Sequence, residues 1–254
     1  MKPDFSNPLL EYVLYLADNS MILGQRLSEW CGHGPVLEQD IALTNMALDL
    51  IGEARHYYQY ASELTLNKWS EDDFPFQRQE RDFRHVLLVE QPNGHWGLTI
   101  MRQFLFDSFH MPYLQELQKS SDIRIAQIAA QSLKETTYHL RYSSEWVVRL
   151  SEGTEESFQK MQNALDDLYT YYGELFIPAP FESDMQARGI CPDLNTIEHH
   201  SKSIFHQTIS KTSLKMPANT FMQQGGKSGI HSENLGFILT EMQYMQKSYP
   251  GLEW

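Results

Sequence analysis

Two residues that can bind a metal ion stand three positions apart in IGEARHYYQY, which covers residues 51–60. They are Glu53 and His56, a carboxylate and an imidazole, within an apolar stretch of helical spacing. A helix places residues i and i+3 side by side. Bundle-type carboxylate di-iron sites use Glu-x-x-His on each of two helices and a single Glu on each of two others. Glu53 and His56 therefore match one of the two paired motifs, and the remaining ligands must come from elsewhere in the chain.

Two later segments place further carboxylate and imidazole groups at helical spacing. Asp107 and His110 form one pair, three residues apart. In KETTYHLRYSSEW the histidine is His139, and a Glu-x-x-His motif needs a carboxylate at position 136, which is Thr136. Glu135 precedes His139 by four residues and is rotated by about 100° around the helix from the position that the motif uses. The second Glu-x-x-His motif is therefore broken.

The ligand count predicts the vestige of a di-iron centre. A working centre needs six ligands with enough negative charge to hold two cations. Near residues 18–22, where the first helix would supply its glutamate, only Asp18 carries a charge. We therefore expect no catalytic residue and no di-iron pair, and a single bound ion remains as an alternative. The groups expected to converge, with hydrogen bonds or a charge pair in place of metal, are Glu53, His56, Asp107 and His139.

Four long helices are expected to position these groups. Apolar residues at intervals of three and four predict helices over about 8–30, 36–65, 95–118 and 122–150. Pro112 predicts a kink or a break in the third helix, and Asp122 is the expected cap of the fourth. One stripe of the fourth helix consists of Ile125, Ala129, Ser132, Thr136, His139 and Ser143.

Additional helices are expected at about 155–176, 193–213 and 231–248, separated by a connection that contains Pro and Gly. No alternating pattern is long enough to predict a significant strand. The predicted fold class is all-α. We expect a single domain over residues 1–254, with an antiparallel four-helix core at about 8–150 and additional helices at about 155–250.

The composition limits the classes of partner. The 254 residues carry a formal net charge of -13, so the overall field repels nucleic acid and anionic membranes. Cys31 and Cys191 have no paired spacing, which argues against a zinc site and a disulfide framework. Neither a signal peptide nor an apolar run of membrane-spanning length is present. We expect a cytoplasmic protein.

A glycine-rich segment, GGKSG at residues 225–229, resembles part of a phosphate-binding loop. The full pattern needs a glycine at position 221, which is Phe221, and a preceding strand, which is not predicted. Lys227, with the backbone of Gly225 and Gly226, remains a candidate for contact with an anion. The alternative is a plain glycine turn. A second group, His199, His200 and His206, is expected at the surface of a polar helix.

Four segments together carry a family resemblance: LSEWCGHGPVLEQDIALTNMALDLIGEAR, LLVEQPNG, KETTYHLRYSSEW and GGKSGIHSENLGFILTEMQYMQ. The chain resembles, over nearly its whole length, the ferritin-like C subunits of bacterial phenylacetyl-CoA epoxygenase complexes. The resemblance implies a ferritin-like fold and pairing with a homologous A subunit that binds the di-iron centre. It also implies that this chain supports the A subunit without carrying metal. Catalytic relatives have Lys-Glu-Glu-x-x-His where this sequence has Thr136.

The reaction implied by the resemblance is epoxidation of the aromatic ring of phenylacetyl-CoA, in aerobic phenylacetate catabolism. Dioxygen and electrons from NADPH, delivered by a separate reductase, would drive it. The implied partners are the catalytic A subunit, other subunits of the complex and the CoA portion of the substrate, with no nucleic acid and no membrane. No cofactor is expected in this chain.

Two main function classes follow. The first is a non-catalytic partner subunit of a multicomponent oxygenase, and the second is an autonomous carboxylate di-iron oxidoreductase; a plain helical scaffold is a third, weaker class. Thr136 favours the first. Trp30, Trp96 and Trp146, with thirteen tyrosines and thirteen phenylalanines, favour a large protein interface, unless most of them fill the core.

Overall fold

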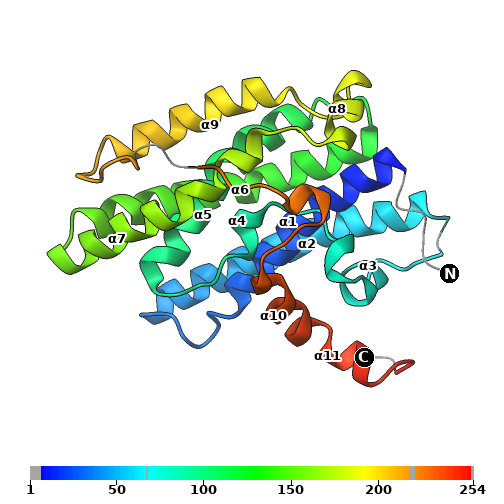
Figure 1. The fold of residues 1–254 in the computed structure, drawn as a ribbon, viewed down its shortest axis with the longest axis horizontal. Coiled ribbons are helices and arrows are strands. Elements are labelled where there is room, and N and C mark those ends of the chain that lie inside the picture. Colours follow the sequence, from blue (N-terminus) through cyan, green and yellow to red (C-terminus); the bar gives the residue numbers. More distant parts are fainter. Residues whose placement is uncertain (1–6, 67, 218–220, 253–254) are drawn as a thin grey trace. The chain divides into compact units, whose positions relative to one another are not determined.

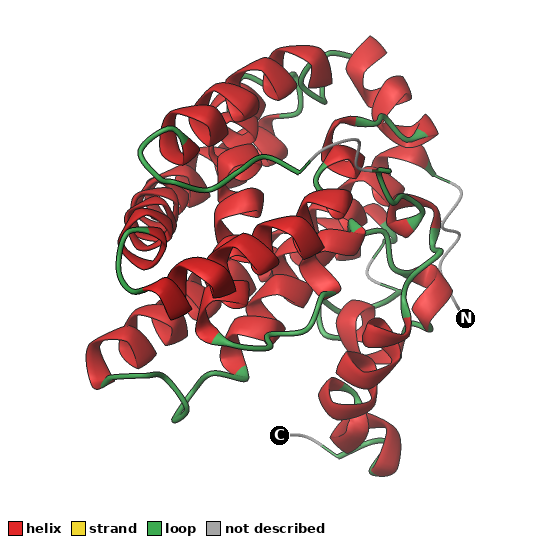
Figure 2. Ribbon diagram, turned by 60° about the vertical axis from the view of Figure 1, so that its left-hand side comes forward, coloured by secondary structure: helices red, strands yellow, loops and turns green. Residues whose placement is uncertain are grey.

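The computed structural model describes residues 7–66, 68–217 and 221–252. Over these ranges the regular structure is helical, and no strand is present (Figure 2). The α-helices are α1 (Pro8–Ser28), α2 (Leu37–Leu64), α3 (Asp73–Gln77), α4 (Leu87–Glu90), α5 (Trp96–Leu117), α6 (Ile123–Ser151), α7 (Glu155–Leu168), α8 (Pro180–Ala187), α9 (Leu194–Ile209), α10 (Glu233–Met242) and α11 (Tyr244–Ser248). Four 3-10 helices join them: η1 (Glu80–Asp82), η2 (Tyr169–Tyr171), η3 (Gly173–Phe176) and η4 (Gly226–Ser228).

The chain forms two compact units. The first contains residues up to 90, residues 179–185 and residues from 225 onward, and the second contains residues 91–178 and 186–224. Each unit is therefore assembled from segments that are distant in the sequence. The organisation as a single domain stays a prediction.

The first unit is organised around α1 and α2, which lie side by side (Figure 1). Asn7 caps α1 by accepting the Leu9 N–H, and Pro8 occupies the first turn, where its missing donor has no cost. Gly24 of α1 lies against Ala47 of α2, whereas Asp18 is bonded to Tyr58, so the two helices are antiparallel. Helices α4 and α10 also pack on α1, which explains why α1 is buried on most sides.

The second unit is organised around α5 and α6. The Asp122 side chain accepts the N–H groups of Arg124 and Ile125, which confirms it as the cap of α6. Helices α6, α7 and α9 all pack on α5, which is buried along most of its length. The stripe predicted for α6 is confirmed as buried, and its members are Ile125, Ala129, Ser132, Thr136, His139 and Ser143.

Several predicted boundaries differ from the structure. Helix α5 continues through Pro112 to Leu117, so a break at the proline is not observed. Packing on three neighbouring helices can offset the backbone hydrogen bond that proline removes. The helix predicted for 155–176 ends at Leu168, where a run rich in tyrosine leads into Gly173 and forms 3-10 turns. The helix predicted for 231–248 is divided into α10 and α11, and α8 forms within the predicted connection.

The structure also tests two predictions about the surface. His199, His200 and His206 are exposed on α9, as predicted. Over the described residues, no helix combines the length and the apolar character needed to cross a membrane. The cytoplasmic location stays a prediction.

Candidate functional site

Asp18, the only charged residue at the expected ligand position of the first helix, is fully buried in the first unit. Its Oδ1 accepts the Tyr58 hydroxyl at 2.7 Å and a short contact from the Arg78 guanidinium. Its Oδ2 accepts a second guanidinium N–H of Arg78 at 2.9 Å and the backbone N–H of Arg84 at 2.8 Å. A carboxylate offers about four acceptor sites. Because four donors occupy them, Asp18 has no acceptor site left for a metal ion.

Arg78 is held by more than its ion pair. The guanidinium is fully buried and donates from Nε to the carbonyl oxygen of Phe74 at 2.6 Å. The ring of Phe83 lies 4.2 Å from the guanidinium carbon, at a distance typical of a cation–π contact. Burial and the charge of Asp18 raise the pKa of Tyr58, so its hydroxyl remains a donor. The Arg78 guanidinium, a permanent cation, therefore lies beside Asp18, the carboxylate that a metal ion would need as a ligand.

Nothing in the sequence marks Arg78 as a functional residue. It belongs to the mixed-charge stretch KWSEDDFPFQRQERDF, in which charged residues ordinarily face solvent. Its partner Asp18 is 60 residues away, and no local pattern indicates a pairing over that separation.

The other two candidates in the first unit lie on α2. Glu53 is buried and His56 is half-buried. The Nδ1 of His56 lies 3.4 Å from the side-chain oxygen of Gln59. Burial, followed by the charge of Glu53, raises the pKa of Tyr57. The Glu-x-x-His motif is therefore present on α2, but Asp18, the carboxylate expected on α1, already binds Arg78.

In the second unit, Asp107 of α5 is fully buried among polar side chains. Its Oδ1 accepts the Gln103 amide at 2.7 Å, and its Oδ2 accepts the Ser143 hydroxyl at 2.7 Å. Burial raises the pKa of Asp107 to about 6, although the charge of His139 and both hydrogen bonds oppose the shift. His110 and His139 are also buried.

Thr136 is buried on the same face of α6 as His139. Its hydroxyl cannot supply the negative charge that a bridging carboxylate brings to a metal pair. Each unit therefore lacks a carboxylate that a di-iron centre requires: Asp18 is occupied in the first, and position 136 is a threonine in the second. The residues present do not fit a di-iron centre.

Lys227 in the GGKSG turn is buried in the first unit. Its Nζ lies 2.8 Å from Oε2 of Glu182 and 5.1 Å from the ring centroid of Tyr15. A Cβ on Gly226 would lie 2.2 Å from the carbonyl oxygen of His85, and Gly225 has a φ of 139°, so both positions favour glycine. These contacts favour the plain turn, and the anion contact of Lys227, Gly225 and Gly226 stays a prediction.

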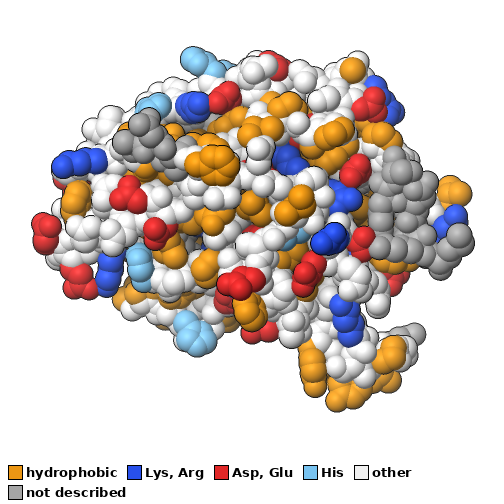
Figure 3. Space-filling view, in the orientation of Figure 1, with side chains coloured by type: hydrophobic (Ala, Val, Ile, Leu, Met, Phe, Trp, Pro, Cys, Tyr) orange, Lys and Arg blue, Asp and Glu red, His pale blue; other side chains and the backbone are white. Residues whose placement is uncertain are grey.

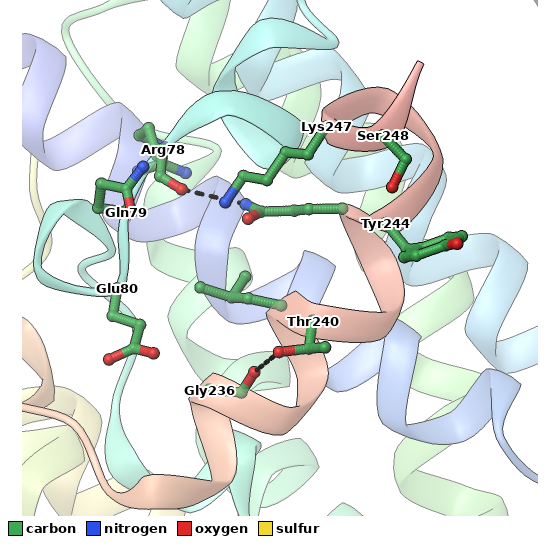
Figure 4. A pocket seen from close by; sticks show the side chains of 10 residues that line it. Arg78, Gln79, Glu80, Gly236, Thr240, Tyr244, Lys247 and Ser248 are labelled. Carbon is green, nitrogen blue, oxygen red and sulfur yellow. Dashed lines mark hydrogen bonds between the residues drawn. The ribbon is translucent and has the colours of Figure 1, made fainter. Parts of the chain in front are cut away.

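A pocket of about 290 Å³ opens in the first unit between residues 78–80 and α10–α11 (Figure 4). Gln243 is one of its lining residues and donates to the carbonyl oxygens of Pro75 at 2.8 Å and Arg78 at 3.1 Å. Glu80 and Lys247 bring opposite charges to its lining. No sequence pattern indicates this pocket, because its walls come from segments more than 150 residues apart.

The arrangement of helices agrees with the comparison of the whole chain. A family model described as phenylacetic acid catabolic protein matches residues 1–254. The chain therefore belongs to the phenylacetic acid catabolic protein family, which is ferritin-like and all-helical. In particular, it is similar to the C subunit of 1,2-phenylacetyl-CoA epoxidase from Escherichia coli strain K12. The two are 43% identical over 248 residues, which cover 98% of this chain and 100% of that protein. The ferritin-like, all-α prediction is confirmed.

Proposed function

We propose that this chain is a non-catalytic partner subunit of a multicomponent di-iron oxygenase that epoxidises the ring of phenylacetyl-CoA. The single observation that carries the proposal is the occupied state of Asp18, the carboxylate expected on α1, whose acceptor sites are filled by two N–H groups of Arg78, the Tyr58 hydroxyl and the Arg84 backbone N–H. Thr136 supports it from the second unit. The name of the Escherichia coli relative supports the substrate and the presence of other subunits.

In this proposal the reactive centre lies in a homologous catalytic A subunit. That subunit holds the di-iron pair, and a separate reductase delivers electrons from NADPH. This chain contributes a folded surface that the A subunit packs against, and it takes no part in bond breaking. An autonomous carboxylate di-iron oxidoreductase is the competing function.

Exposed apolar side chains in the first unit support a partner role. One set lies at the start and along one side of α2: Val36, Leu37, Ile41 and Leu48. Another covers α10, α11 and the residues after them, visible at the lower right of Figure 3: Phe237, Tyr244, Met245, Tyr249 and Leu252. Contiguous exposed apolar residues commonly mark protein interfaces.

The number of aromatic residues supports a protein interface less strongly than the sequence suggested. The largest fully buried side chains include Tyr12, Tyr15, Phe104 and Phe106, so many aromatics fill the two cores. Trp30, Trp96 and Trp146 are half-buried. The core explains many of the aromatic residues, and the support for an interface comes from the exposed apolar residues of α2, α10 and α11.

Iron analysis separates the two functions. We expect the chain, purified from iron-supplemented cells, to contain no iron pair and no oxo-bridge absorption band. Thr136→Glu should restore the Glu-x-x-His sequence motif without restoring iron binding, because Asp18 stays bound to Arg78. The matched control is Thr137→Glu, one position away on the exposed face of α6. Two irons in the unaltered chain would refute the partner role and favour the autonomous enzyme.

Association with the catalytic subunit is a second test of the proposed partner role. We expect the isolated chain to self-associate or to lose stability, because obligate interfaces commonly bury more than about 2,000 Å² of mainly apolar surface. Adding the iron-bearing subunit should form a tight heteromer, raise the melting temperature and enable turnover of phenylacetyl-CoA. A stable monomer in light scattering that ignores the catalytic subunit at micromolar concentration would show that the proposal is wrong.

A further inference from the structure

Three side chains with metal-binding atoms converge in the first unit, on segments other than α1 and α2. They are His85, Glu90 and His231, and one ligand atom from each lies within 4.8 Å of the other two. His85 and Glu90 come from the segment that ends in α4, and His231 precedes the cap of α10. The side chains of His85 and Glu90 are fully buried, and that of His231 is 4% exposed.

One carboxylate oxygen forms the centre of the cluster. Oε2 of Glu90 lies 2.7 Å from Nε2 of His85 and 2.9 Å from Nδ1 of His231. The other oxygen, Oε1, accepts the backbone N–H of Ser232 at 2.7 Å. The backbone of Glu90 is also fixed, because Arg26 donates twice to its carbonyl oxygen. The carboxylate is therefore oriented by its surroundings before any ligand arrives.

The contact of the second ring nitrogen of His231, Nε2, indicates whether Nδ1 has a lone pair available for a metal ion. Nε2 lies 3.1 Å from the carbonyl oxygen of Phe83, which can only accept, so this contact favours the tautomer with a proton on Nε2. In the neutral ring, Nδ1 then directs a lone pair at the Glu90 carboxylate. Two acceptors at 2.9 Å repel each other unless a positive charge lies between them. A metal ion bound by Nδ1 and the carboxylate would supply that charge and satisfy both lone pairs.

His85 is free to adopt the tautomer that binds metal. Without a metal ion, the Glu90 carboxylate 2.7 Å away favours a ring proton on Nε2, whereas the buried Nδ1 has no hydrogen-bond partner among the described residues. The proton can reside on Nδ1 and leave the Nε2 lone pair for a cation. Metal-bound histidines typically donate their other ring N–H to a carbonyl or carboxylate, as His231 does to Phe83.

We propose that His85, Glu90 and His231 bind one divalent transition-metal ion, with zinc as the best match. Two imidazoles and one carboxylate suit zinc and its first-row neighbours, whereas calcium and magnesium prefer oxygen ligands alone. The ion would join α4 to the start of α10 in the same unit. This inference does not depend on the partner role, because a single ion here supplies no di-iron pair.

The two imidazole rings of this cluster stack, with centroids 4.3 Å apart. Binding an ion through both in-plane lone pairs therefore needs a small rotation of one ring. A hydrogen-bonded cluster without a metal ion is the competing state, and the experiment must separate the two.

The experiment uses the full chain, stripped with a chelator and then titrated with cobalt and with zinc. We expect one ion per chain, a tetrahedral or five-coordinate cobalt absorption spectrum and a higher melting temperature with zinc. His85→Asn removes one ligand, and His231→Gln removes another. Each should weaken zinc binding by more than about tenfold while the apo chain stays folded.

The matched control is His199→Ala, which removes an exposed histidine of α9 and should bind zinc as the unaltered chain does. Failure of the unaltered chain to take up an ion would overturn the proposal. So would uptake that both His85→Asn and His231→Gln retain. Either result would show that the cluster is held by hydrogen bonds alone. Iron pairs in the same samples would count against the partner role alone, so the two proposals fail separately.

Discussion

Two aspartates, one in each unit, are equally buried but are stabilised in different ways. Asp18 has four donors, two of them from the permanent cation Arg78. Asp107 has hydrogen bonds from the neutral side chains of Gln103 and Ser143, and burial raises its pKa to about 6. Burial alone therefore does not fix the charge of a carboxylate. The donors to Asp18 include a cation, whereas those to Asp107 are neutral, and Asp107 can itself become neutral near pH 6.

The largest effect should come from Arg78→Met, which removes the cation and leaves Asp18 buried without charge compensation. Breaking one side of a buried ion pair typically costs about 3–5 kcal/mol of unfolding free energy. Chemical denaturation would measure the loss. The control is Arg55→Met, which removes the exposed Arg55–Glu71 pair and should change little.

The double variant Asp18→Asn with Arg78→Met sharpens this test. It removes both charges and should be more stable than Arg78→Met alone, because no carboxylate is left uncompensated. If Arg78→Met and Arg55→Met had equal stability, the Asp18–Arg78 pair would not have the importance assigned to it.

Asp107→Asn should change the pH dependence of stability. The folded pKa of about 6 lies above the ordinary aspartate value of 3.8, so the folded state binds the extra proton between these values. The stability that Asp107 contributes is therefore present below about pH 4 and is lost as pH rises through 6. The loss is on the order of 3 kcal/mol.

Urea denaturation from pH 4 to pH 7 would test this. The stability of Asp107→Asn relative to the unaltered chain should increase over that range, because asparagine does not titrate. The exposed Asp184→Asn is the control and should show no such trend. Parallel stability curves for all three chains would mean that Asp107 has an ordinary pKa.

His56→Ala should have the smallest effect, because His56 is only half-buried. Removing it leaves its polar neighbours less well satisfied, at a typical cost of about 1–3 kcal/mol. The melting temperature of the chain should fall, while the reconstituted complex, kept cold, retains most of its turnover. Abolished turnover in a folded, fully assembled complex would assign His56 a direct role in catalysis.

Local sequence patterns predicted much of the fold, because helices and their caps depend on residues that are close in the sequence. The stripe on α6 repeats at intervals of three and four, and the Asp122 cap acts on N–H groups two and three residues away. The break in the second Glu-x-x-His motif is also local, since it depends only on Thr136. Features that depend on neighbouring residues could therefore be predicted.

The interactions that were not predicted join distant segments. Arg78 contacts Asp18, which is 60 residues away in the sequence. Lys227 contacts Glu182, 45 residues away, and His231 contacts Glu90, 141 residues away. Arg78, Lys227 and His231 lie in polar or glycine-rich sequences that ordinarily face solvent. Only the packing of helices reveals that these charges are buried and paired.

The guanidinium of Arg78 also has a consequence for the order of events in a cell. A metal centre forms only after an ion is found and its ligands lose their protons, so its folding depends on supply. The cation beside Asp18 is encoded in the chain and is present as soon as the chain is synthesised. This part of the first unit can fold before any iron has been delivered and can remain folded when iron is scarce.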